Sequence, residues 1–263
     1  MFLVLRNRKV KDWCLFDFGI SCFPTLILTF FYGAFYARHI NGDANEGTAL
    51  WGFSISLASL LAAIIFLSIL FVSSSIIKRI NIKFFTVFFF ILIISSSSLF
   101  FFNSESNKYH PLVLVIISFV AFEVVNLLYN ISLDKVTTKK SKGLISNLGW
   151  AFGYLGGFIA LLIVLLVLKI VEGNNESTTF ILSLIGPFVG IWTFIFGYPH
   201  LISLRNSYFY LPLIKETLRE FKPSTLGWFI VSYFFLITEL SVSLLSQACL
   251  LHFYLDSRSQ RFF

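Results

Sequence analysis

Long apolar runs alternate with short polar segments along this chain. A helix needs about 20 apolar residues to cross the hydrocarbon core of a bilayer, whereas transmembrane strands give shorter segments that alternate with a period of two. Runs of the helical kind lie at about residues 14–36, 50–72, 84–102, 111–130, 148–168, 179–199 and 226–251. The pattern therefore predicts an all-α, polytopic transmembrane bundle of about seven helices.

Charged residues are scarce and unevenly placed. They make up 13% of the 263 residues, against about 25% in a soluble domain, and the mean hydropathy is +0.85. Alternate polar segments, namely the N-terminal tail, 73–83, 134–147 and 200–225, carry 15 of the 20 lysines and arginines. Because cytoplasmic loops are enriched in these residues, we expect an integral membrane protein with a cytoplasmic N-terminus.

The charge pattern also gives an expected organisation. Residues 1–204 are predicted to form a six-helix transmembrane half-bundle, 205–225 a cytoplasmic loop, and 226–263 a seventh transmembrane helix with a short tail. The net charge of +7 arises mainly from the cytoplasmic segments. The expected partner of these basic residues is therefore the lipid bilayer, and no nucleic-acid partner is expected.

A carboxylate, Asp17, lies in the first predicted helix. A charged side chain near the bilayer centre costs about 2.5–3.5 kcal/mol on insertion scales. Ser21 and Pro24 follow at i+4 and i+7, on the same helical face. Asp17 is therefore a candidate for substrate binding or proton coupling, and a structural role at the start of the helix is the alternative.

A second polar stripe lies in the fourth predicted helix. Asn126 and Asn130 follow Glu123 at i+3 and i+7, which places the three side chains on one face. This face is expected to meet protein or water rather than lipid. Its functional interpretation is a substrate or proton pathway, and its structural interpretation is an interhelical hydrogen-bond clamp worth about 0.6 kcal/mol per bond.

Glycines recur at a spacing of four in the fifth predicted helix. Gly149, Gly153 and Gly157 form two overlapping G-x-x-x-G steps, and Gly156 adjoins them. Small residues at this spacing let a neighbouring helix approach backbone to backbone. The pattern predicts helix packing and carries no information about a cargo.

Other candidate chemistry is absent from the sequence. The cysteines and histidines show no ligand spacing: Cys14, Cys22 and Cys249 lie in apolar runs, and His39, His110, His200 and His252 at predicted helix ends or loops. No catalytic or nucleotide-binding motif occurs either. We therefore expect no metal, no cofactor and no enzymatic activity.

The residues support a family resemblance. Tyr129 and Asn130, followed by the stretch SKGLISNLGWAFGYLGG at 141–157, resemble a signature of the vacuolar effluxer-like permeases. This branch of the major facilitator superfamily is related to the autophagy-associated vacuolar amino-acid exporter. The run FDFGIS at 16–21 and the pair Trp51-Gly52 resemble the openings of the family's first two helices. The similarity covers about residues 14–200.

The resemblance implies a secondary transporter that works by alternating access between two six-helix halves, of which this chain holds the first half plus one helix. It places Asp17, Asn130 and the glycines of the fifth helix toward the central cavity or its packing seams. It also makes the 73–83 loop, with Lys78 and Arg79, a cytoplasmic gating loop. The departures from the family are Ile20 in place of an asparagine, a gating loop without its usual Asp and Gly, and LITE at 236–239.

Two functional hypotheses follow. The first is a transporter, or a truncated transporter half, that moves a small solute, with an amino acid as the candidate, and works with a second half or as a homodimer. The second is a membrane remnant or scaffold that does not transport. The resemblance alone supports the solute, and the departures in the gating loop favour the second hypothesis.

Overall fold

The computed structural model describes residues 6–75, 79–138, 141–171, 175–205 and 208–210. Contacts divide the chain into two units, residues 1–211 and 212–263. The second unit lies outside the described residues, and with it the predicted seventh helix at 226–251, the LITE run and Cys249.

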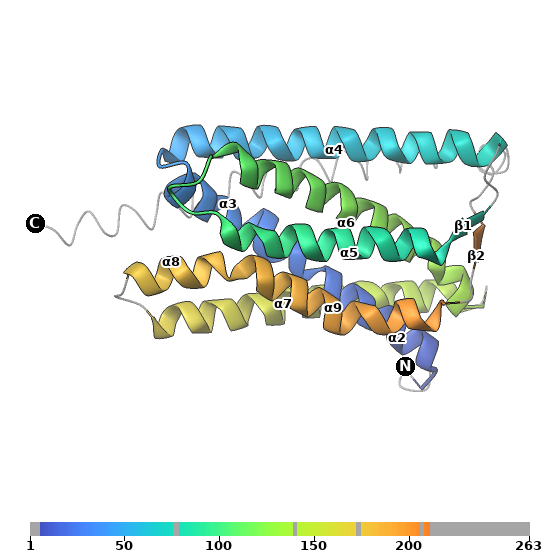
Figure 1. The fold of residues 1–263 in the computed structure, drawn as a ribbon. Helices are drawn as coiled ribbons and strands as arrows, with labels where there is room; N and C mark the ends of the chain where they lie inside the picture. The colour runs from blue at the N-terminus through green and yellow to red at the C-terminus, as the bar shows by residue number, and fades with distance from the viewer. Residues whose placement is uncertain (1–5, 76–78, 139–140, 172–174, 206–207, 211–263) are drawn as a thin grey trace, which may run out of the picture. The chain divides into compact units, whose positions relative to one another are not determined.

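Helices dominate the described part of the chain (Figure 1). After the first span they are α4 (Ala44–Ser75), α5 (Ile82–Ser98) with a 3₁₀ turn at Leu99–Phe101, α6 (Tyr109–Val136), α7 (Lys142–Ile170), α8 (Asn175–Ser183) and α9 (Ile185–Ser203). Six stretches are long and apolar enough to cross a membrane: Arg8–Ile40, Ala44–Phe66, Ile82–Phe101, Tyr109–Leu133, Lys142–Ile170 and Ser177–Ser203. The predicted all-α bundle is confirmed.

The first span is longer than predicted, because its helix α2 (Arg8–Ile20) begins within the basic tail. The Asn7 side chain caps this helix by accepting the backbone N–H of Lys9 at 3.0 Å. Asp17 is thus the tenth residue of α2 and lies inside the helix rather than at its start.

The first span also changes its helical form. After α2 it continues as a π-helical segment, Pro24–Phe30, then α3 (Tyr32–Phe35) and a second π-helical segment, Tyr36–Ile40. Proline cannot donate the helical hydrogen bond, and its ring clashes with the carbonyl four residues earlier. Pro24 therefore accounts for the first widened turn, and such turns are frequent at functional sites.

The first polar loop is shorter than the predicted 37–49. The span reaches Ile40, and α4 begins at Ala44. The Asp43 carboxylate accepts the backbone N–H groups of Asn45 at 2.8 Å and Glu46 at 3.0 Å. This capping arrangement satisfies two of the free donors of the first turn of α4, so residues expected in a loop are helical.

Helix α2 crosses the bundle and packs on both α7 and α9 (Figure 1). Helix α5 packs on α6 and α9, and α4 packs on α6. The core therefore forms where α2, α5, α6, α7 and α9 meet, and its largest fully buried side chains there include Trp13, Phe16, Tyr129, Phe85 and Phe89.

A short antiparallel strand pair joins two distant segments. Strand β1 (Arg79–Asn81) pairs with β2 (Tyr208–Tyr210), with Ile80 opposite Phe209. Three residues of the predicted 205–225 loop are thus in a strand, as is Arg79 of the predicted gating loop. Lys78 lies outside the described residues. The sequence did not reveal this pairing, because the two strands are separated by almost the whole bundle.

Candidate functional site

The glycine face of α7 lies against α2. A Cβ atom added at Gly153 would lie 2.8 Å from the Ser21 hydroxyl and 2.9 Å from Cγ of Asp17. At Gly157 it would lie 2.5 Å from the Thr25 hydroxyl, and at Gly156 it would lie against the backbone of Phe18. A Cβ atom at Gly153 or Gly157 would require these side chains to shift, and at Gly156 it would require the backbone of α2 to shift, so the close α2–α7 contact depends most on Gly156.

Gly149 completes this face one turn nearer the start of α7. A Cβ atom there would lie 2.8 Å from the indole of Trp13 and 2.8 Å from the hydroxyl oxygen of Tyr129. The four glycines thus allow α2, and at Gly149 also α6, to approach α7 closely. The sequence predicted close packing at these positions, and the structure adds which helices meet there.

Asp17 projects toward this glycine face and is half-buried. It accepts a hydrogen bond from the Ser21 hydroxyl at 3.3 Å, the pair that the i+4 spacing placed on one face. Ser21 in turn offers its backbone carbonyl to the Thr25 hydroxyl at 2.8 Å. No ion pair to Asp17 is found within the described ranges.

Only two of the three polar side chains in the α6 stripe, Asn126 and Asn130, are hydrogen-bonded to each other. Asn130 donates from Nδ2 to the carbonyl oxygen of Asn126 at 2.9 Å and to its side-chain oxygen at 3.3 Å. Glu123 is half-buried, and Asn130 is exposed. Among the residues described, no hydrogen bond or ion pair joins Glu123 to Asp17 or to another helix. The structure therefore gives two separate polar sites, at Asp17 and along α6.

A third polar group was missed in the sequence. His200 lies in the last turn of α9, at the helix end that the sequence indicated, and it is 0% exposed there. Its Nε2 lies 3.0 Å from the Ser132 hydroxyl, which donates to the carbonyl oxygen of Tyr129 at 2.6 Å. The Trp13 indole N–H donates to the same carbonyl at 3.2 Å. A network of buried hydrogen bonds thus ties α9, α6 and α2 together.

Counting protons assigns the tautomer of His200. A serine hydroxyl has one hydrogen, and that of Ser132 is used on the carbonyl of Tyr129. Ser132 must therefore accept from His200, so Nε2 carries the proton and Nδ1 is an acceptor. The rings of Phe16, Phe85 and Tyr129 contact the imidazole, which places the histidine in an aromatic pocket.

Substituting Ser132→Ala is expected to lower the free energy of unfolding by about 1–3 kcal/mol, because the buried N–H of His200 loses its acceptor. The matched control is Ser56→Ala on α4, where an exposed serine donates to the carbonyl of Gly52 in its own helix at 2.9 Å. Thermal unfolding in detergent compares the two variants. Equal stabilities would show that the network carries no net stabilisation.

Two loops are joined at the other end of the first span. Lys108 pairs with Glu46 at 2.6 Å, and the Tyr36 hydroxyl donates to the carbonyl of Lys108 at 3.1 Å. The hydrogen bond to Glu46 raises the pKa of Lys108 above its ordinary value. The same contact lowers the pKa of Glu46 below its ordinary value. The stabilisation by the pair is therefore present at neutral pH, and it is lost as the pH rises through the raised lysine pKa or falls through the lowered glutamate pKa.

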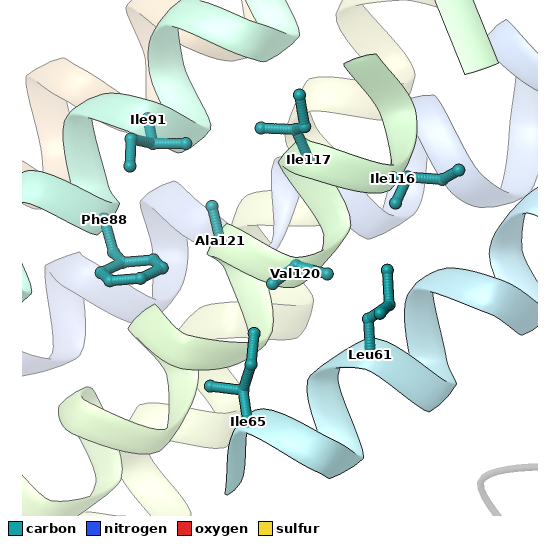
Figure 2. Close-up of a pocket in the computed structure, with 8 residues that line it drawn as sticks. All are labelled: Leu61, Ile65, Phe88, Ile91, Ile116, Ile117, Val120 and Ala121. Carbon is teal, nitrogen blue, oxygen red and sulfur yellow. The ribbon is translucent and has the colours of Figure 1, made fainter. Parts of the chain in front are cut away.

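The cavity in Figure 2 is purely apolar and has a volume of about 290 Å³. It lies between α4, α5 and α6, and its lining side chains are Leu61, Ile65, Phe88, Ile91, Ile116, Ile117, Val120 and Ala121. Ligand sites normally include a few polar groups that fix orientation, and this lining offers none. The cavity therefore suits hydrocarbon rather than a polar solute.

No cluster of three metal-binding side chains occurs within the part of the chain that the structure describes. Cys14 and Cys22 are buried and unbonded, and no hydrogen bond links either to His200. The described residues therefore offer polar groups for binding or proton exchange, mainly Asp17, Glu123 and the buried network.

The six spans and the carboxylates within them define a polytopic integral membrane protein. The vacuole effluxer Atg22-like family matches residues 132–218, which include the glycine face of α7. The chain is also 23% identical over 254 residues to the uncharacterized MFS-type transporter YxiO of Bacillus subtilis (strain 168). The predicted resemblance to the effluxer-like branch of the major facilitator superfamily is confirmed.

That match covers 88% of this chain and 57% of the YxiO protein. The chain thus spans little more than half the length of the curated relative that it matches. No solved structure matches it.

Proposed function

We propose that this chain acts in a secondary transporter that moves a small solute across a bacterial cytoplasmic membrane by alternating access. The observation that carries the proposal is Asp17, a carboxylate without a cationic partner among the described residues, set against the glycine face of α7 in a chain similar to an MFS-type transporter. Carboxylates inside membrane spans mark substrate and proton pathways. Glu123, Asn126 and Asn130 on α6 are the second candidate set.

An amino acid is the proposed solute, on the basis of the resemblance to the vacuolar effluxers. The proposed partner is a second transporter half or a second copy of this chain, because alternating access needs two halves that move against each other. The N-terminus is proposed to be cytoplasmic, as the distribution of lysine and arginine indicates. No enzymatic step is included, since binding and release suffice for transport.

The proposal is tested by expressing the chain in a host that lacks its major amino-acid exporters and measuring the release of preloaded, labelled amino acids. Release above background is expected, and it should fall to background in an Asp17→Asn variant that inserts normally. Well-inserted wild-type protein that releases none of a broad panel would contradict transport by this chain with a second copy of itself as the partner. The competing proposal, a scaffold without transport, is favoured by the gating loop that lacks Asp and Gly.

A further inference from the structure

The phenol of Tyr129 is a buried hydrogen-bond donor without an acceptor. The side chain is 2% exposed, and its hydroxyl oxygen has no partner within the described ranges. Its ring is held by stacking on Trp13, with centroids 4.4 Å apart, and on Phe16, with centroids 5.1 Å apart. A buried hydroxyl left unpaired costs about 1–3 kcal/mol, so an acceptor within reach would be strongly favoured.

The hydroxyl of Tyr129 points at the same helix face as the carboxyl of Asp17. The Tyr129 oxygen lies 2.8 Å from the Cβ position of Gly149, and Cγ of Asp17 lies 2.9 Å from that of Gly153. Four residues of α-helix rise by about 6 Å, so the two groups lie about one turn apart along α7.

The Asp17 carboxylate can accept more hydrogen bonds than it receives from the described residues. A carboxylate offers about four acceptor sites, and the only hydrogen bond recorded to this one in the described residues is that from Ser21 at 3.3 Å. Cys14, three residues earlier on α2, is a titratable neighbour of Asp17, and α7 presents Gly153 to the carboxylate. Tyr129 is thus an unpaired donor on the same face of α7 as a carboxylate that can accept further hydrogen bonds.

We infer that Tyr129 is a positioning residue for Asp17. Its hydroxyl donates to the Asp17 carboxylate, either directly after rotation of the aspartate side chain or through one bridging water molecule. Gly149 and Gly153 keep the space between the two groups free of side chains. The inference rests on the proposed function for its consequence in transport, because it makes Tyr129 a determinant of when Asp17 takes up a proton.

The contact has a measurable consequence that needs no solute. A donor to a carboxylate stabilises its ionised form, so removing the donor lets the carboxyl stay protonated to higher pH. Infrared titration of the purified protein follows the carbonyl stretch of protonated Asp17, which is assigned by its loss in Asp17→Asn. Tyr129→Phe keeps the stacked ring, and it should move the titration midpoint upward by about one pH unit or more.

The matched control is Tyr154→Phe, which removes a phenol that is 73% exposed on α7. Its midpoint should equal that of the wild type. An unchanged or lower midpoint in Tyr129→Phe, or an equal upward shift in Tyr154→Phe, would overturn the inference.

A second measurement applies if Tyr129→Phe does not fold. Wild-type protein carrying isotope-labelled tyrosine should show a change in a phenol band at the pH at which Asp17 titrates, and Asp17→Asn should lack that change. A tyrosine spectrum that is constant through the Asp17 titration would overturn the inference. If the titration behaves as expected while the chain releases no solute, the proposed function fails and the contact between Tyr129 and Asp17 stands.

Discussion

Gly156→Ala is expected to separate α2 from α7 and to lower stability by about 3 kcal/mol, the upper end of the range for overpacked sites. The added methyl group would lie against the backbone of Phe18, including its Cα atom at 2.7 Å. A side chain in the way can change rotamer, but a helix backbone must move as a whole. Heating in mild detergent, followed by size-exclusion chromatography, measures the fraction that stays monodisperse.

Gly143→Ala is the matched control on the same helix, because nothing lies within 4 Å of the added Cβ atom there. Alanine is a better helix former than glycine by about 1 kcal/mol, so this variant should equal or exceed the wild type. Equal losses in both variants would mean that the cost of Gly156→Ala does not come from its close contact with α2.

Glu123→Gln is expected to abolish proton-coupled release of solute while leaving membrane insertion intact. Glutamine has nearly the same size as glutamate and can still form hydrogen bonds. Its amide, however, cannot take up and release a proton as a carboxylate does. The measurement is solute release from preloaded cells at several external pH values, with insertion checked on the same cells.

Glu46→Gln supplies the acidic control, because Glu46 is exposed and pairs with Lys108 away from the α6 stripe. This variant should release solute with the wild-type dependence on pH. If Glu123→Gln also keeps that dependence, Glu123 has no part in coupling, and Asp17 remains the single carboxylate proposed for it.

The apolar runs were sufficient to predict the six described spans, because a bilayer sets both their length and their composition. Helical spacing likewise predicted that Ser21 would lie beside Asp17 and that Asn126 would lie beside Asn130. Both pairs are hydrogen-bonded. These are contacts within one helix, where the period of 3.6 residues determines which side chains meet.

Contacts between helices could not be predicted in the same way. The glycine spacing of α7 indicated a close neighbour, but nothing in it identified α2, since the register between helices depends on the whole bundle. The site of His200 was missed for the same reason, because its partner Ser132 lies 68 residues away. The start of α2 within the basic tail was missed because charged residues were taken to end the span, whereas Asn7 caps it there.

The most direct test of the central claim is solute efflux from liposomes that contain only the purified chain. Preloaded, labelled amino acids should leave these liposomes faster than protein-free ones, with a rate that depends on the pH gradient. Asp17→Asn at the same protein content should abolish the difference. Fully inserted wild-type protein whose efflux equals that of protein-free liposomes, for every amino acid tried and with either direction of the gradient, would contradict transport by this chain as a homodimer.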